Sequence, residues 1–287
     1  PAALPLLRMA ASELANDAPA IAARALIYAA GLADDLDLAA EASQDVLRAV
    51  ELARIAGGGG LIAAATTGVG AILAERGDPV AVDYCTEGIA AMGIETPLEQ
   101  RRSVLANCAR LAWQVGDLVT ARRWALEATP LLAGPPRIAT SQLASTLAAL
   151  DLAEGALDSA QEHAGQALAV ARELDLGREL PLVLAIASRV HLARGEHEDA
   201  IAAALACLDA ASTSGMQWTS AIAFETCAAV LADRHPDDAA TLAGSAAALR
   251  SAGSRPAPVT LRLGPTPGDV VTRDAATALA RGLLNRD

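Results

Sequence analysis

The residues best suited to chemistry in this chain include four histidines, and none of them has the spacing of a metal-binding motif. His197 precedes Glu198 but lacks the second histidine of the H-E-x-x-H zinc pattern. His163 and His235 have no metal-spaced neighbour in the sequence, and His191 lies in an apolar helical stretch that favours a buried core histidine. The sequence therefore predicts neither a metal site nor a cofactor.

The serines and paired carboxylates also lack a catalytic pattern. Ser12, Ser103 and Ser220 are not flanked by the glycines of a Gly-x-Ser-x-Gly elbow. The acidic pairs Asp34-Asp35 and Asp237-Asp238 fall at expected turns and helix starts, where negative charge favours the helix dipole. We expect a chain that is not an enzyme.

Four cysteines complete the reactive residue types: Cys85, Cys108, Cys207 and Cys227. Each lies in an apolar helical context without C-x-x-C spacing, where a free thiol behaves as a small hydrophobic side chain. This pattern predicts free thiols, and it fits a reducing, cytoplasmic compartment.

A run of four glycines, Gly57–Gly60, could cradle a phosphate group. A phosphate loop needs a strand before the glycines and a Lys-Ser/Thr pair after them. Here a helical pattern precedes the run and Leu61 opens an apolar segment after it. The run therefore predicts a turn between two helices.

Composition and charge limit the elements that could position any site. The chain has 287 residues, of which 53 % are hydrophobic but only 2 % aromatic. Alanine and leucine dominate, and both favour helix, so the chain is expected to be all-α. The formal net charge of −12 argues against nucleic-acid binding by this segment. No expected helix has the length and apolar character of a membrane span.

The helices follow a repeat of 39–40 residues. A turn glycine recurs at Gly77, Gly116, Gly155 and Gly195, with Arg234 at the matching place. Glycine at a helix C-terminus adopts the left-handed conformation at low cost, so the recurrence marks one turn used repeatedly. Such a period indicates stacked helix pairs.

Small residues recur around each turn. Seven residues before it stand Gly70, Ala109, Ala148, Ser188 and Cys227. Five residues after it stand Val82, Ala121, Ala160, Ala200 and Ala239, and nine after it stand Thr86, Ala125, Ala164, Ala204 and Ala243. Small side chains at these positions allow the paired helices to approach closely.

These small positions and the glycine turn resemble the tetratricopeptide repeat (TPR), although the usual period there is 34 residues and the first-helix aromatic positions are mostly aliphatic here. Longer Ala/Leu-rich units of this kind are similar to the C-terminal repeat regions of bacterial signalling ATPases and of LuxR-like or maltose-activator-like transcriptional regulators. The segment Asp238–Arg250 resembles the last helix of such regions. The absence of an initial Met leads us to expect a piece of a longer polypeptide.

The resemblance implies a right-handed α-solenoid, a TPR-like superhelix of about six antiparallel helix pairs. We expect one repeat domain over residues 1–252 and a Pro-rich connector with a C-terminal capping helix over 253–287. The expected units are 19–56, 61–95, 97–133, 136–175, 178–214 and 216–252. In the connector, Val259–Leu263 could lie extended, and Asp269–Asn285 is expected to form the capping helix.

The TPR layout implies a concave groove lined by the first helix of each pair. The expected groove residues are Asn107, Arg110, Trp113, Gln114, Gln142, Ser145, Thr146, Arg189 and Glu225. Asn107 corresponds to the asparagine that holds a peptide backbone in that family, Arg110 could pair with a carboxylate, and Trp113 could anchor a ligand. The alternative is an ordinary solvated helix face. Trp124 is expected to pack between helices.

We therefore expect a non-catalytic scaffold or sensor in a larger cytoplasmic signalling ATPase or transcription regulator. Its partner would be a protein, a peptide or a small inducer, with no direct nucleic acid and no membrane. The alternative is a free-standing adaptor or a self-association module that forms homo-oligomers.

Overall fold

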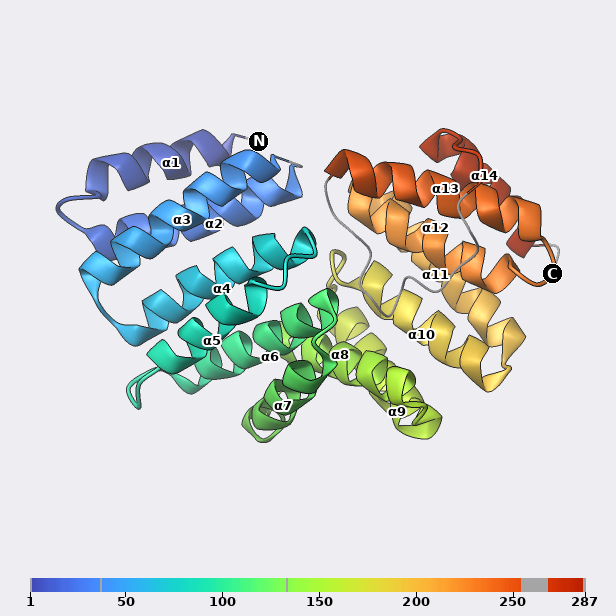
Figure 1. Cartoon of the computed structure of the whole chain (residues 1–287), viewed down its shortest axis with the longest axis horizontal. Coiled ribbons are helices and arrows are strands. Elements are labelled where there is room, and N and C mark those ends of the chain that lie inside the picture. Colours follow the sequence, from blue (N-terminus) through green and yellow to red (C-terminus); the bar gives the residue numbers. More distant parts are fainter. Residues whose placement is uncertain (1, 37, 133, 254–267, 286–287) are drawn as a thin grey trace. The chain divides into compact units, whose positions relative to one another are not determined.

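The computed structural model describes residues 2–36, 38–132, 134–253 and 268–285. Within these ranges the chain is all-helical, with fourteen α-helices, one short 3₁₀ helix and no strand, as the composition predicts (Figure 1). Contacts divide it into two compact units, unit 1 (Pro1–Leu132) and unit 2 (Ala133–Asp287).

Unit 1 contains seven α-helices and the 3₁₀ helix η1. They are α1 (Ala3–Leu14), α2 (Pro19–Asp35), α3 (Ala39–Ala56), α4 (Gly59–Glu75), α5 (Ala81–Ala91), α6 (Leu98–Val115), α7 (Leu118–Ala128) and η1 (Thr129–Leu132). Each helix packs mainly on its chain neighbours, as the pairs α2–α3, α4–α5 and α6–α7. In addition α2 contacts α4, and α4 contacts α6. We call α2, α4 and α6 the first-helix layer of unit 1.

Unit 2 repeats this arrangement with seven further helices. They are α8 (Ile138–Glu154), α9 (Leu157–Glu173), α10 (Leu180–Arg194), α11 (His197–Ser214), α12 (Gln217–Leu231), α13 (Pro236–Gly253) and α14 (Arg273–Leu284). The pairs are α8–α9, α10–α11 and α12–α13, and α10 contacts both α8 and α12. Each of the six expected units thus contains one helix pair.

The glycine turns have the conformation that the sequence predicts. Gly77, Gly116, Gly155 and Gly195 all have positive φ, between 70° and 91°. The backbone N–H of Gly116 also donates to the carbonyl of Trp113, and this hydrogen bond closes the last turn of α6. A residue with a Cβ would be strained at each of these turns.

The small positions before the turns are buried between helices, as expected. Ser188 on α10 is fully buried, and its hydroxyl donates to the carbonyl of Ala200 on α11 at 2.8 Å. A Cβ on Gly70 would lie 3.1 Å from both the Ala81 carbonyl and the Cys85 sulfur on α5. Small side chains therefore set the close spacing of the helix pairs.

The α5 helix departs from the expected register. Val82 is only partly buried and Thr86 is exposed, whereas Ala81 and Cys85 fill the buried positions. The turn into α5 is wound with i to i+3 hydrogen bonds, including Ala81 N–H to the Asp78 carbonyl. A 3₁₀ turn has fewer residues than an α-turn, so the buried positions of α5 lie one residue earlier in the sequence than expected.

Only two of the four glycines in Gly57–Gly60 form the expected turn between helices. Gly57 and Gly58 have positive φ and connect α3 to α4, whereas Gly59 and Gly60 already belong to α4. A Cβ on Gly59 would lie 1.8 Å from the carbonyl oxygen of Ala91 at the end of α5. Gly59 therefore serves a close helix approach rather than chain flexibility.

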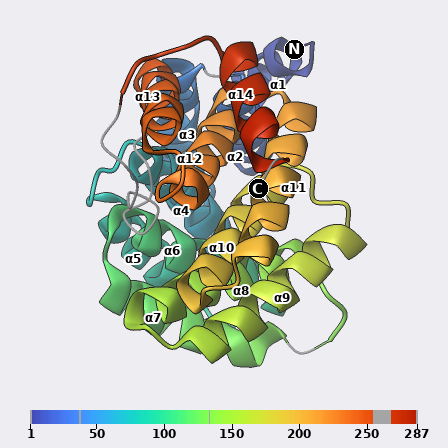
Figure 2. The same cartoon turned by 90° about the vertical axis from the view of Figure 1, so that its right-hand side faces the viewer.

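The last described helix covers the end of unit 2. In Figures 1 and 2, α14 (red) lies beside α12 and α13, and it contacts both helices as well as α11. Its apolar face, Ala276, Ala280 and Leu283, is buried in the core of unit 2. The expected capping role thus matches its packing, whereas Val259–Leu263 lies outside the described residues. No described helix has both the length and the apolar character needed to cross a membrane.

Candidate functional site

The strongest candidate site is a polar cluster on α6. Asn107, Arg110 and Gln114 stand three and four residues apart, so they share one helix face. All three are partly exposed, whereas Cys108 and Ala109 on the opposite side are fully buried. The polar face of α6 therefore lies on the accessible side of the first-helix layer of unit 1.

The Arg110 guanidinium is held by two neutral amides. Its Nη1 donates to Gln114 Oε1 at 3.3 Å, and its Nη2 donates to Asn107 Oδ1 at 3.5 Å. Its Nε is buried and has no acceptor among the described residues, where no carboxylate forms an ion pair with Arg110. The cluster therefore presents a positioned positive charge that neighbouring side chains do not neutralise.

One repeat before Asn107, Arg110 and Gln114, the neighbouring helix α4 carries Gly68, Ala71 and Glu75. The positions before Asn107 and Arg110 are thus short, whereas the position before Gln114 carries a carboxylate. Arg110 itself stays partly exposed.

The tryptophans do not line this surface. Trp113 is only 1 % exposed, with its Nε1 buried and lacking an acceptor, so the expectation of a surface anchor is not met. Its neighbour in the sequence pattern, Gln114, keeps the exposed position instead. Trp124 is buried as expected, with the Arg123 guanidinium 5.7 Å from its ring centroid. Burial of the large apolar area of its ring favours the core position of Trp113.

In unit 2 the expected residues on α8 are largely inaccessible. Ser145 and Thr146 are buried, and both hydroxyls donate to the backbone carbonyl of Gln142, at 3.0 and 2.8 Å. Gln142 is partly buried, and its amide donates to Glu179 at 3.3 Å. The two hydroxyls thus satisfy their own helix, as Ser and Thr commonly do within helices, and are not surface ligands.

The remaining expected residues form part of a charged cluster between α10, α12 and α13. Glu225 on α12 accepts two hydrogen bonds from Arg250 on α13, at 2.5 and 2.7 Å. Arg189 on α10 is buried, and desolvation lowers the pKa of its guanidinium, opposed by the charge of Glu225. Sequence analysis missed Arg250, because only the packing of α13 on α12 brings it to Glu225.

A second charged cluster joins α9, α10 and α11. His191 Nδ1 lies 2.7 Å from Glu196 Oε2, while Arg194 donates to Glu196 at 2.8 Å and to Asp158 at 2.6 Å. His191 is expected to be a core histidine with its polar atoms satisfied; it has a partner in Glu196 but is only partly buried, with its side chain 25 % exposed. Because Arg194 and His191 both donate to Glu196, the pKa of this carboxylate is lowered.

The same cluster has the geometry of a cation site. Ligand atoms of His191, Glu196 and Asp199 lie within 4.8 Å of one another. However, both carboxylate oxygens of Glu196 already have partners, Arg194 on one and the His191 ring nitrogen on the other, and a metal would have to displace one of these contacts. These contacts connect the end of α10 to the start of α11 across the Gly195 turn. In the preceding helix pair, α8–α9, His163 and Asp151 make a similar contact of 2.7 Å.

Comparison of the chain with protein-family models and with curated protein sequences finds no match. The site itself is a cationic cluster: the Arg110 guanidinium with two neutral hydrogen-bonding amides on one face of α6.

Proposed function

We propose that the chain is a non-catalytic binding scaffold whose first-helix layer in unit 1 holds a protein or peptide partner. The observation that carries the proposal is the Arg110 guanidinium, positioned by the amides of Asn107 and Gln114 and not neutralised by a described carboxylate. Amide side chains can also bond to a partner's backbone N–H and C=O groups, whatever its side chains are. The three residues together suit an extended segment that carries a negative charge.

The wider context of this proposal is a right-handed, TPR-like superhelix within a larger cytoplasmic regulator. The 39–40-residue repeat, the paired helices and the glycine turns support the repeat architecture. The four buried free thiols fit a reducing compartment. In this view a bound protein, peptide or small inducer would be sensed by the repeats and communicated to an ATPase or effector domain.

Site-specific photo-crosslinking tests the proposal. A photoreactive amino acid replaces Ser103, which is exposed on the same face of α6 as the cluster, in cells that express the protein. A control chain carries it in place of Leu126, which is exposed on α7. We expect a discrete covalent adduct from position 103 that position 126 does not give. Equal labelling from both positions, or none from position 103, would contradict the proposal. An adduct of small mass would identify an inducer rather than a protein.

A further inference from the structure

The turn at Gly195 in unit 2 carries a set of side chains that the other repeat turns lack. His191 stands four residues before the glycine, Glu196 one residue after it and Asp199 four residues after it. All three are residue types that bind metal ions. Each of the other turns has an apolar residue in at least one of these positions, which hold Leu73, Asp78 and Ala81; Ala112, Asp117 and Thr120; Asp151, Ala156 and Ser159; and Val230, His235 and Asp238. The set is therefore specific to one turn and is not a general feature of the repeat.

The three side chains converge in space. Their ligand atoms lie within 4.8 Å of one another, and Nδ1 of His191 lies 2.7 Å from Oε2 of Glu196. In a tetrahedral zinc site with nitrogen and oxygen ligands, the ligand atoms are about 3.4 Å apart. The separations at the Gly195 turn lie on both sides of that value. Asp199 is exposed, so its side chain can rotate toward the other two without a change in the backbone.

Helix capping does not explain the position of the Glu196 side chain. Glu196 is the N-cap residue of α11, yet its side chain makes no capping hydrogen bond. In the corresponding place before α7, Asp117 accepts a hydrogen bond from the backbone N–H of Thr120 and caps that helix. Glu196 instead turns back to His191 and Arg194 at the end of α10. Its Oε2 therefore faces an imidazole, which is itself a common metal ligand.

Asp199 adds a negative charge that is not balanced. It has no hydrogen bond or ion pair with any described residue, although its carboxylate lies close to that of Glu196. The guanidinium of Arg194 is already engaged, because it donates to Glu196 at 2.8 Å and to Asp158 at 2.6 Å. Three carboxylates thus share one positive charge, and two negative charges remain when the imidazole of His191 is neutral. A divalent cation would balance them.

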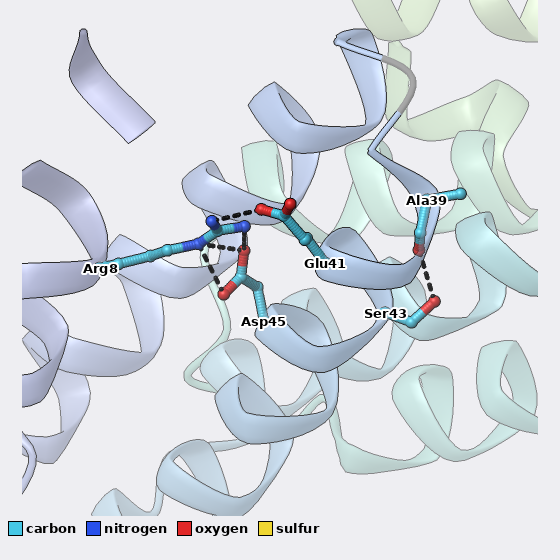
Figure 3. Close-up of polar contacts among 5 residues, drawn as sticks. All are labelled: Arg8, Ala39, Glu41, Ser43 and Asp45. Carbon is cyan, nitrogen blue, oxygen red and sulfur yellow. Dashed lines mark hydrogen bonds and ion pairs between the residues drawn. The ribbon is translucent and has the colours of Figure 1, made fainter. Parts of the chain in front are cut away.

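In unit 1 a comparable pair of carboxylates is neutralised within the chain. Glu41 and Asp45 lie one turn apart on α3, and Arg8 on α1 donates to both of them, from Nη1 and Nη2 (Figure 3). At the Gly195 turn the guanidinium reaches Glu196 but not the second carboxylate of the pair. A bound cation would there have the role that Arg8 has on α3.

We propose that His191, Glu196 and Asp199 bind a zinc ion, since imidazole together with carboxylate suits this metal. The ion replaces the hydrogen bond between His191 Nδ1 and Glu196 Oε2, and the imidazole keeps its proton on Nε2. Arg194 retains its hydrogen bond to Oε1 and so orients the carboxylate from outside the ligand shell. Water completes the fourth position. The bound ion connects the end of α10 to the start of α11 and stabilises unit 2.

Calorimetric titration of zinc into the metal-free chain tests the site. We expect one zinc ion per wild-type chain, and at least about tenfold weaker binding in Asp199→Asn, because a ligand contributes no less than an outer-shell partner. Asp199 is exposed and unpartnered, so this variant should keep the wild-type circular dichroism. The matched control His163→Gln removes the other histidine–carboxylate pair and should bind zinc normally. No zinc binding by the wild type, unchanged binding in Asp199→Asn, or an equal loss in the control would overturn the proposal.

Thermal unfolding with two metals tests the contribution of the imidazole. Zinc should raise the unfolding midpoint of the wild type, because an ion that binds only the folded chain stabilises it. Magnesium prefers sites made of oxygen ligands, so at the same concentration it should have no such effect. Zinc should also leave the midpoint of His191→Gln unchanged, whereas His197→Gln, which removes the exposed neighbouring imidazole, should respond like the wild type. An equal rise with both metals, or loss of the zinc effect in His197→Gln, would refute a site built on His191.

Discussion

Substitution of Gly59 by alanine tests how closely the helix pairs must approach. Alanine usually stabilises a helix relative to glycine, by at most about 1 kcal/mol. Here, however, the new Cβ would lie 1.8 Å from the Ala91 carbonyl oxygen, whereas ordinary contact begins at 3.4 Å. The obstacle is backbone, which cannot rotate away, so α4 and α5 must separate by more than 1 Å. Overpacking of this kind costs about 1–3 kcal/mol, and we expect a net loss of stability.

Gly31 provides the matched control in the same unit. It lies within α2 on an exposed face, and a Cβ added there meets nothing within 4 Å. Gly31→Ala should therefore raise the free energy of unfolding by about 0.5–1 kcal/mol. The two substitutions are chemically identical, so their opposite signs would isolate the effect of the close approach.

Urea unfolding followed by tryptophan fluorescence measures both changes. Trp113 and Trp124 lie in unit 1 and Trp218 lies in unit 2, so a Trp218→Phe background makes the signal report on unit 1 alone. This matters because two units need not unfold in a single transition. If the two variants have the same free energy of unfolding, α4 and α5 do not approach as closely at Gly59 as the structure shows.

Three further results are expected. Gly116→Ala should lower the free energy of unfolding of unit 1 by about 1–2 kcal/mol, measured by the same urea assay, because φ there is 91°; an unchanged midpoint would argue against the left-handed cap. Arg194 and His191 lower the pKa of Glu196, so the ionised carboxylate stabilises the fold at pH values above its ordinary pKa of 4.5. This stabilisation is lost as the pH falls below 4.5 and through the lowered pKa. The midpoint of thermal unfolding of Glu196→Gln should therefore depend less on pH in the acidic range than that of the wild type. Identical pH profiles would contradict the contacts of Glu196 with Arg194 and His191. The native thiols should resist alkylation at pH 8 until the chain unfolds, since burial raises the pKa of Cys227 to about 12; rapid labelling of the folded chain would refute their burial.

The repeat pattern was enough to predict the helix pairs and their turns. Gly116 and its equivalents determine where each first helix ends, because the left-handed conformation is a local property that sequence reveals directly. The register of α5 could not be predicted in this way. It depends on whether the turn after Asp78 winds as a 3₁₀ or an α turn, and Val82 and Ala81 are both small enough to be buried.

The candidate site was predicted only in part, for a related reason. The resemblance to the TPR layout implied that Asn107, Arg110 and Gln114 line one groove, and the structure brings these three together. Trp113 and Gln114 are neighbours in the sequence, and periodicity does not resolve which of them turns inward at the edge of that face. The ion pair of Arg250 with Glu225 depends on the packing of two helices and has no local signal.

The central claim is tested most directly by measuring how tightly the partner captured from position 103 binds purified Arg110 variants. Loss of a charge-assisted hydrogen bond of about 1.5–3 kcal/mol should weaken binding roughly 10- to 100-fold in Arg110→Ala. The control Arg48→Ala removes an exposed arginine from α3, away from the first-helix layer, and should bind normally. Equal affinity of Arg110→Ala and the wild type would contradict the account.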